Sequence, residues 1–350
     1  MDYYIGTLAV FLLINIMAAL GLDLQFGVAG TLSFAYIVFQ AAGAYTGAIL
    51  TLGPDKSNGG FQQYIGGSRL PFPLPMICGA LVAGVVALAV GLIGLRRVRR
   101  DYQAMVMLVI SVIATAMAEN AVSVVNGTNG LSLVPPPFKW FSHAGTTDSI
   151  WGYAALCVIP VILTYFVVYR ITESPWGRAL RAARDHEHAA AAMGKNVARM
   201  QLTAFIVGAM IAGASGVLLV QFIGSWAPSG WLYKETFIYV TAIIVGGRAN
   251  RRGVVIGTFL VATLVGEAPT YLPAFGPTPV FVASMDWLIS GIMVLIFLWF
   301  RPQGAFPEPV RQLSKRLGLV GEPSDGGSVG GDAFPGPPGG AVSPSGRARQ

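Results

Sequence analysis

The sequence contains few charged residues and few cysteines. Only 11% of its 350 residues are charged, against roughly 25% in soluble globular domains, and 54% are hydrophobic. Its two cysteines, Cys78 and Cys157, lie inside apolar runs, which indicates small buried side chains and supports no disulfide framework. His186 and His188 have no metal-ligating neighbours, so we expect no metal site there. The low share of charged residues and the high share of hydrophobic ones together indicate that water is not the main solvent of this chain.

The net charge of +7 would by itself suit nucleic acid binding. The basic residues instead stand in short blocks between apolar runs, at 96–100, 170–199, 248–252 and 301–316. Such blocks follow the positive-inside rule of membrane proteins, so we place them in the cytoplasm and expect no nucleic acid partner. The segments placed outside are poor in Lys and Arg and cover 53–71, 126–150, 224–234 and 273–279.

Long apolar runs recur along the chain. A helix crosses a bilayer with about 20 apolar residues, because it satisfies its own backbone hydrogen bonds. The sequence therefore predicts an all-α, polytopic membrane bundle with about eight or nine transmembrane segments. The predicted crossings are 4–22, 28–52, 73–95, 103–125, 151–169, 202–223, 254–272 and 280–300, with a shorter run at 236–245. If the short run also crosses, the N-terminus lies outside and the C-terminus inside.

The two ends of the chain differ in composition. Met1-Asp2-Tyr3-Tyr4 lacks the basic region of a signal peptide, so we expect the apolar run after it to remain as the first helix. After Gly321 the chain is rich in Gly, Pro and Ser and cannot bury enough apolar surface to fold. We therefore assign 1–320 to a transmembrane domain and 321–350 to a disordered cytoplasmic tail.

The segment 174–194 combines strong helix signals with many charges. Ser174 can cap a helix, Pro175 suits its first position, and Gly194 can end it in the left-handed conformation. Each charged residue would cost about 2.5 to 3.5 kcal/mol at the centre of a bilayer, so this helix lies along the membrane surface. It is either a solvated connector or a docking helix that transmits a partner's motion as a stiff lever.

A docking helix needs charged and apolar groups on accessible faces. Arg178 and Arg181 share one face at helical spacing, with Asp185 following. Trp176 and Leu180 offer apolar anchors to a groove on a partner.

Several short strings, in this order and spacing, resemble one family of transport proteins. The cytoplasmic coupling segment of branched-chain amino acid ABC permeases of the LivH/LivM type is similar to the stretch Ser174-Pro175-Trp176-Gly177-Arg178-Ala179-Leu180-Arg181-Ala182, followed by Glu187 and Gly194. Further strings resemble the first block of the family (21–34 and 43–46), an external loop of the LivM branch (127–132) and the end of the last helix (300–304). Departures at Ala35-Tyr36 and at 246–253 bear on the transported ligand more than on the class of machine.

The resemblance implies a permease subunit of an ATP-driven importer for branched-chain or similar hydrophobic amino acids, in a bacterial plasma or inner membrane. The partners it implies are two ABC ATPase subunits, a homologous permease subunit, a periplasmic or extracellular amino-acid-binding protein and the lipid bilayer. The only Gly-Lys pair, Gly194-Lys195, lacks the pattern of a phosphate-binding loop. We therefore expect no enzyme activity and no cofactor in this chain, with ATP and Mg bound by the partner subunits.

Small and polar residues within the apolar runs are the only sequence features that indicate a substrate path. Glycines at 43, 47, 208, 213 and 216 favour close packing of helices. The alternative is that Gly27, Gly30 and Gly43 leave room for a solute path or for a bend during alternating access. Ionisable residues in lipid are costly, and Asp23, Glu119, Glu267 and Asp286 stand near or within the predicted crossings. We expect Glu119 to lie deepest and to orient its helix, with a substrate or proton-coupling role as alternatives. The candidate path residues are Gly27, Gly30, Ser33, Gly43, Tyr45, Thr46 and Glu119.

Other functions remain open at this stage. An ABC permease for urea or short amides would share the same architecture. An ion-coupled secondary carrier would transport its solute alone in liposomes and would depend on a residue such as Glu119. A membrane scaffold or enzyme is the third alternative, although no nucleophile and base stand at a recognisable spacing.

Overall fold

The computed structural model describes residues 2–54, 62–95, 100–138, 146–262, 291–292, 295–296, 299–300 and 304–306. Within these residues the fold is helical and contains no β-strand, only the isolated bridges Tyr64–Val125 and Leu131–Trp226. The all-α prediction is therefore confirmed. The chain divides into two compact units, residues 1–308 and residues 309–350. The second unit and the predicted disordered tail lie outside the described residues.

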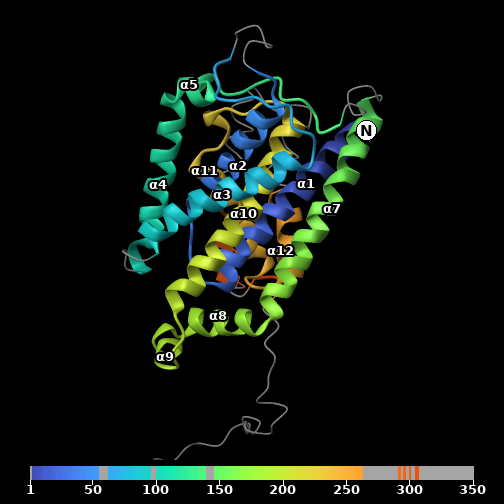
Figure 1. Cartoon of the computed structure of the whole chain (residues 1–350). Helices are drawn as coiled ribbons and strands as arrows, with labels where there is room; N and C mark the ends of the chain where they lie inside the picture. The colour runs from blue at the N-terminus through green and yellow to red at the C-terminus, as the bar shows by residue number, and fades with distance from the viewer. Residues whose placement is uncertain are drawn as a thin grey trace, which may run out of the picture. The chain divides into compact units, whose positions relative to one another are not determined.

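The described helices follow one another along the chain, with longer connections from α2 to α3 and from η3 to α7 (Figure 1). Their bounds are α1 (Asp2–Asp23), the π-helical η1 (Leu24–Val28), α2 (Tyr36–Thr51), α3 (Leu74–Gly94), α4 (Arg100–Asn120), α5 (Val122–Val125), the 3₁₀ turn η3 (Gly127–Asn129), α7 (Thr146–Glu173), α8 (Pro175–Asp185), α9 (Glu187–Ala192), α10 (Val197–Ile223), the 3₁₀ turn η4 (Pro228–Gly230), α11 (Tyr233–Gly246) and α12 (Arg251–Thr258). Among the described residues, five helices are long and apolar enough to cross a membrane, namely Asp2–Val28, Leu74–Gly94, Tyr102–Asn120, Asp148–Glu173 and Val197–Ile223.

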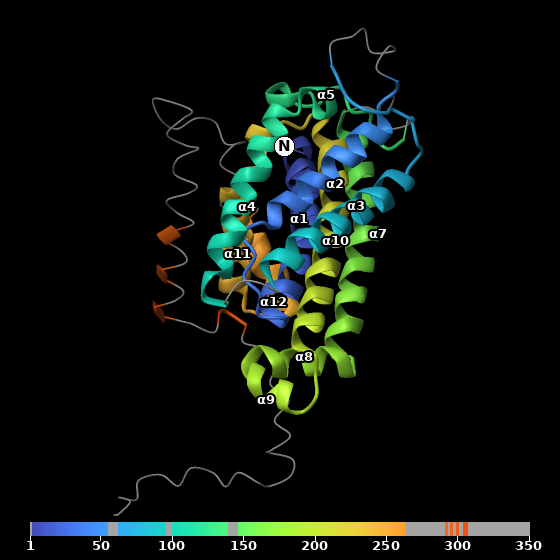
Figure 2. The same cartoon turned by 60° about the vertical axis from the view of Figure 1, so that its left-hand side comes forward.

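Two helices, α1 and α10, form the centre of the bundle, whereas α4 and α7 lie at its periphery (Figures 1 and 2). In the apolar windows of α1 and α10, 72% of the residues are buried, against 22% to 28% in α3, α4 and α7. Small residues let α10 approach its neighbours closely: a Cβ atom on Gly43 would fall on the backbone of Gly213. The packing interpretation of these glycines is confirmed there.

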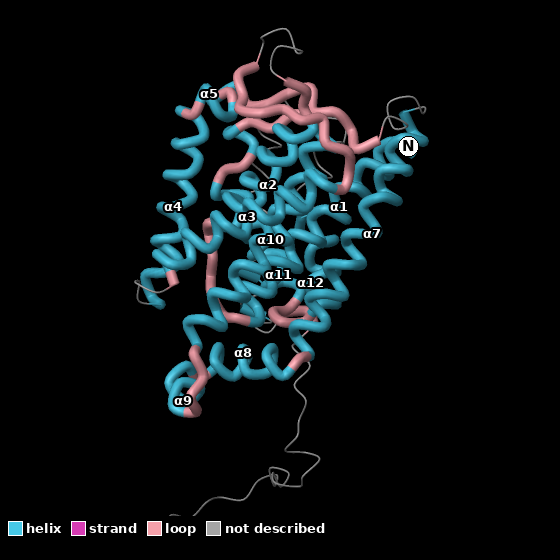
Figure 3. Tube along the Cα trace, viewed as in Figure 1, coloured by secondary structure: helices cyan, strands magenta, loops and turns pink. Residues whose placement is uncertain are grey.

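The bundle has two ends, which we call the α8 end and the α5 end after the helices that lie there (Figure 3). α7 runs from the α5 end to the α8 end, α8 and α9 lie crosswise there, and α10 returns (Figure 1). The described basic residues of the 170–199 and 248–252 blocks lie on these segments and on the connection from α11 to α12. They therefore share the α8 end, as the charge pattern predicts.

The predicted crossing at 28–52 is wrong at its start. The first helix runs on through η1 to Val28, and α2 begins only at Tyr36. Both the backbone N–H and the hydroxyl of Thr31 donate to the carbonyl of Gln25, at 2.9 and 2.8 Å, which ends the helix. Gly30 takes the left-handed conformation there (φ +73°). The connection at 29–35 is buried within the bundle at Thr31, Ser33 and Ala35.

Other predicted boundaries also move. The predicted crossing at 103–125 ends at Asn120, because the backbone leaves the helix at Ala121 and a separate turn, α5, follows. The short run at 236–245 belongs to α11, whose 14 residues span about 21 Å at 1.5 Å each, less than a bilayer core. Of the predicted crossings at 254–272 and 280–300, only the start of the first and isolated pairs of residues of the second are described.

Candidate coupling site at the α8 end

The corner between α7 and α8 is built by Ser174 and Gly177. The Ser174 hydroxyl accepts a 3.1 Å hydrogen bond from the Gly177 N–H and donates to the Ile171 carbonyl at 2.7 Å, while Pro175 occupies the first helical position. The predicted cap is therefore confirmed. A Cβ atom at Gly177 would fall on the carbonyl oxygens of Ile171 and Thr172, so this tight corner requires glycine.

The prediction of one continuous helix over 174–194 is wrong. α8 ends at Asp185, the backbone of His186 is extended (φ −142°, ψ 86°), and α9 covers Glu187–Ala192. The change of direction lets Ala183, Ala190 and Val197 pack together in one small buried cluster. Gly194 is left-handed with φ +77°, as predicted for the end of the segment.

The apolar side of α8 faces the bundle. Leu180 is fully buried and packs in a cluster with Leu24, Val28, Ala204 and Ala249, which come from three other parts of the chain. The interpretation of Leu180 as an anchor for a partner is therefore wrong, because the side chain already fills the junction between α8 and the bundle. Trp176 is partly buried against the same cluster.

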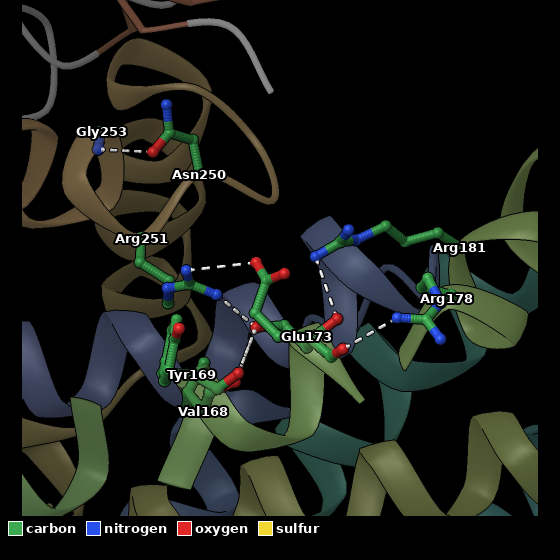
Figure 4. Close-up of polar contacts among 9 residues, drawn as sticks. Val168, Tyr169, Glu173, Arg178, Arg181, Asn250, Arg251 and Gly253 are labelled. Carbon is green, nitrogen blue, oxygen red and sulfur yellow. Dashed lines mark hydrogen bonds and ion pairs between the residues drawn. The ribbon is translucent and has the colours of Figure 1, made fainter. Parts of the chain in front are cut away.

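Two arginines of α8 cap the last turn of α7. Arg178 Nη1 donates to the Glu173 carbonyl and Arg181 Nη2 to the Thr172 carbonyl, both at 3.3 Å (Figure 4). The last carbonyls of a helix have no partner within it and carry its negative dipole end, so guanidinium groups stabilise them. The two arginines thus hold α8 against the end of α7.

Arg251 approaches the same turn of α7 from the start of α12. Its Nη1 donates to the Thr172 hydroxyl, its Nη2 lies 3.4 Å from Glu173 Oε1, and its guanidinium carbon lies 4.6 Å from the centre of the Tyr169 ring. Figure 4 shows Glu173 between Arg251 on one side and Arg178 and Arg181 on the other. Sequence analysis counted Arg251 only as part of a basic block, and no local signal indicates these partners.

A second set of contacts ties the α8 end to η1. Arg184 Nη1 donates to the carbonyl of Gly27, and its Nε lies 2.9 Å from Asp185 Oδ1. Asp23, which is fully buried, accepts a 2.9 Å hydrogen bond from the Ala249 N–H through Oδ1. A Cβ atom at Gly27 would fall on the Asp23 carboxylate. Gly27 therefore serves close packing at this junction, and α1, α8 and the connection before α12 meet there.

The opposite face of α8 and α9 is left exposed. On α8, Arg178, Ala182 and Asp185 are exposed, and Glu187 and His188 continue this surface on α9. We call these five residues the exposed face of α8–α9. Ala179, in contrast, is half-buried. The face carries both charge signs, so it lies in water or against a polar partner surface and not in lipid.

The candidate path residues of the first block lie in different settings. Ser33 is buried in the connection between η1 and α2, where its hydroxyl has no hydrogen-bonding partner among the described residues. Tyr45 accepts a 3.1 Å hydrogen bond from Trp231 Nε1, and the Thr46 hydroxyl donates to the Ala42 carbonyl at 2.7 Å. Gly27 and Gly30 lie in or beside the helix break, whereas Gly43 packs on α10. None of them lines the cavity of about 490 Å³ that the structure shows at the α5 end.

Glu119 does not lie deep in its helix. α4 ends at Asn120, and Glu119 is exposed in its last turn, close to η3 at the α5 end. The expectation of a deeply placed carboxylate is therefore wrong, because the helix ends five residues earlier than the apolar run suggests. Proton coupling through this residue loses its structural support.

Polar side chains that sequence analysis did not select meet in the centre of the bundle. The Tyr239 hydroxyl donates to Asn15 Oδ1 at 3.0 Å and lies 3.5 Å from Gln40 Oε1, and Gln40 Nε2 lies 3.4 Å from Ser215 Oγ. These residues come from α11, α1, α2 and α10. An amide inside an apolar run, such as Gln40, is the signal that would have indicated them. In the described ranges, no three His, Cys, Asp or Glu residues are grouped as a metal site would need.

Comparison with known proteins gives one consistent result. Residues 4–298 match the family model described as "Branched-chain amino acid transport system / permease component". The chain is 28% identical over 340 residues to the high-affinity branched-chain amino acid transport system permease protein LivM of Escherichia coli K12, covering 89% of this chain and 72% of LivM. It is 25% identical to LivH of Salmonella typhimurium over 309 residues (84% and 91%), and 29% identical to the fructose import permease protein FrcC of Rhizobium meliloti over 150 residues (42% and 41%). No solved structure matches the chain.

Proposed function

The chain belongs to the family of branched-chain amino acid transport system permease components, and we propose that it is the permease subunit of an ATP-driven importer for branched-chain or similar hydrophobic amino acids. The observation that carries the proposal is α8, a helix that lies across one end of the bundle with one face packed and the other exposed. A helix held in this way moves as a unit when a partner pushes on it, whereas a flexible loop absorbs the motion.

The contacts of α8 supply a route for such motion into the bundle. Arg178 and Arg181 tie α8 to the end of α7, and Arg184 ties it to the carbonyl of Gly27 in η1. Arg251 ties the same turn of α7 to α12. In this proposal, closure of the ATPase subunits displaces α8, and these ties carry the displacement to α1, α7 and α12.

The remaining partners follow from the same proposal. Separate ATPase subunits bind ATP and Mg and dock on the exposed face of α8–α9. In this proposal the α8 end faces the cytoplasm of a bacterial cell, and the protein lies in the plasma or inner membrane. A homologous permease completes the translocation path, and an external binding protein delivers the solute at the α5 end. With α2, α11 and the segments beyond residue 262 added to the five long helices, the chain crosses the membrane about eight or nine times.

Amino acids are the proposed solute because LivM and LivH carry that assignment in their names. The buried, irregular connection at 29–35 supports a path beside Ser33, since non-helical backbone at membrane depth is tolerated where it lines a cavity or is covered by protein. Uptake of labelled leucine by cells that express the complete transporter, in competition with urea, acetamide and fructose, identifies the solute class.

Coupling is tested with a small, exposed residue of this face. Ala182→Trp places a bulky group in the middle of the exposed face, and we expect ATP-dependent uptake to fall at least about tenfold, as when a docked surface loses more than about 1.4 kcal/mol of binding. The matched control is Ala116→Trp, on the exposed side of α4, which should transport normally. Both variants should reach the membrane at the same level.

Two results would contradict the proposal. Normal ATP-dependent uptake by Ala182→Trp would remove the docking role of α8. Transport by the purified chain alone in liposomes, driven by an ion gradient without ATPase subunits, would identify a secondary carrier instead.

A further inference from the structure

A cavity of about 490 Å³ lies at the α5 end, away from the coupling site. Its wall is formed by the first turns of α1 and α7, by the last turn of α10 and by Pro136 of the preceding loop. Aromatic rings make up much of the wall: Phe222 lies edge-on to Phe11 with ring centroids 5.4 Å apart, and 5.2 Å from Tyr153. A cavity of this volume accommodates a small molecule or part of a larger amphiphile.

One polar side chain of the wall is left without partners. Gln221 is only 3% exposed, and neither its Nε2 nor its Oε1 has a hydrogen-bonding partner among the described residues. It stands in the run Gly216-Val217-Leu218-Leu219-Val220-Gln221-Phe222-Ile223, where leucine would fill a similar volume. Burial of an unpaired amide is unfavourable, so the presence of glutamine at this place indicates a partner from outside the chain.

The chemistry of the amide restricts that partner. A glutamine side chain presents two N–H donors and one carbonyl acceptor, so a matching group must both accept and donate hydrogen bonds. The aromatic wall requires an apolar body attached to this group. The hydroxyl of Tyr153 already donates to the Leu218 carbonyl at 2.7 Å and does not compete for the amide.

The surroundings indicate a lipid. Tyr4, Ile5 and Trp151 lie on the same first turns of α1 and α7 and are 45% to 54% exposed, which is typical of side chains that face the interface region of a bilayer. We propose that the cavity holds the headgroup and glycerol region of a phospholipid whose headgroup carries an N–H or O–H donor beside the phosphate, with Gln221 as the residue that selects it. Phosphatidylethanolamine and phosphatidylglycerol have such a donor, and phosphatidylcholine lacks it.

The proposal is independent of the coupling function and is tested on the purified full-length chain. Native mass spectrometry from detergent, with phosphatidylethanolamine or phosphatidylcholine of identical acyl chains, measures the fraction of chains that retain one lipid. The ammonium of phosphatidylethanolamine can donate a charge-assisted hydrogen bond to the Gln221 carbonyl and the trimethylammonium of phosphatidylcholine cannot, so we expect the wild type to retain phosphatidylethanolamine at least about tenfold better. Gln221→Leu should bind both lipids equally.

Two further variants separate the selection of a lipid headgroup by Gln221 from general effects of a substitution on lipid retention. Gln103→Leu removes another buried glutamine, whose Nε2 also has no partner in the described part of the chain, but Gln103 does not line the cavity, so the preference should persist. Ser149→Trp fills the cavity while leaving Gln221 in place and should lower the retention of both lipids.

Three results would overturn the proposal. The first is the same preference for phosphatidylethanolamine in the wild type and in Gln221→Leu. The second is loss of this preference in the control Gln103→Leu. The third is unchanged retention of both lipids by Ser149→Trp. Weaker association of Gln221→Leu with a binding protein, with lipid preference intact, would assign the cavity to protein docking and equally contradict a lipid site.

Discussion

The polar side chains at the two ends of the bundle differ in whether they have hydrogen-bonding partners among the described residues. At the α8 end, Arg178, Arg181, Arg184 and Arg251 each reach a carbonyl, hydroxyl or carboxylate of a neighbouring element. At the α5 end, the amide of Gln221 is buried beside a cavity with no partner in the described structure. The first end is thus tied together by the chain's own side chains, whereas the second leaves a buried amide without a partner among the described residues.

The difference has a simple chemical origin. A guanidinium group carries five N–H donors at the tip of a long side chain, so an arginine at one helix start can satisfy the free carbonyls at the end of another helix. A glutamine is shorter and finds a partner only where a neighbouring helix offers one close by, as Ser215 does for Gln40, and Gln221 has none among the described residues. Its hydrogen bonds depend on what enters the cavity.

The largest effect is expected from Gly177→Ala at the α8 end. The added Cβ would fall on the carbonyl oxygens of Ile171 and Thr172, so the corner must open, at a cost of about 1 to 3 kcal/mol of unfolding free energy. Thermal unfolding in detergent measures this loss. The control is Gly230→Ala near the α5 end, where an added Cβ meets no atom within 4 Å and the stability should not change. If Gly177→Ala and Gly230→Ala lost the same unfolding free energy, the interpretation of Gly177 as the residue that a tight corner requires would be wrong.

A smaller loss is expected from Arg251→Ala. The variant removes a cation–π contact with Tyr169, a hydrogen bond to the Thr172 hydroxyl and a partly exposed ion pair with Glu173. After allowance for solvent screening, these contacts together contribute about 1 to 2 kcal/mol. Unfolding of the single and double variants with Glu173→Gln measures the coupling between the two side chains. Arg252→Ala, at an exposed position one residue further on, is the control and should be nearly neutral. A result in which Arg252 matters as much as Arg251 would show that total charge, not the geometry of Figure 4, holds this end.

The smallest effect is expected from Gln221→Leu, which should raise the free energy of unfolding instead of lowering it. In detergent without added phospholipid, Gln221→Leu should stabilise the chain by up to about 1 kcal/mol, because leucine has no amide to bury without a partner. The melting temperature reports this gain, and phosphatidylethanolamine should raise the melting temperature of the wild type more than that of the variant. Destabilisation in both conditions would mean that the amide is satisfied within the protein, and the contrast between the two ends would disappear.

Much of the coupling segment could be predicted from local sequence. The Ser174 cap, Pro175 at the first helical position and left-handed Gly194 depend on atoms within a few residues, so residue type alone indicated them. Hydropathy likewise predicted long apolar helices, and charge blocks predicted that the basic residues share one end. The ordered strings of the first block and the coupling segment indicated the family that the comparison then showed.

Tertiary structure alone decided the rest. Arg251 meets Thr172 across 79 positions, Arg184 meets Gly27 across 157, and Asp23 meets Ala249 across 226. The same distant packing turned Leu180 inward, ended α4 before Glu119 could lie deep, and left Gln221 beside a cavity. Hydropathy and caps act along one helix, whereas these outcomes depend on which helices come together, because only then does each side chain meet or lack its partner.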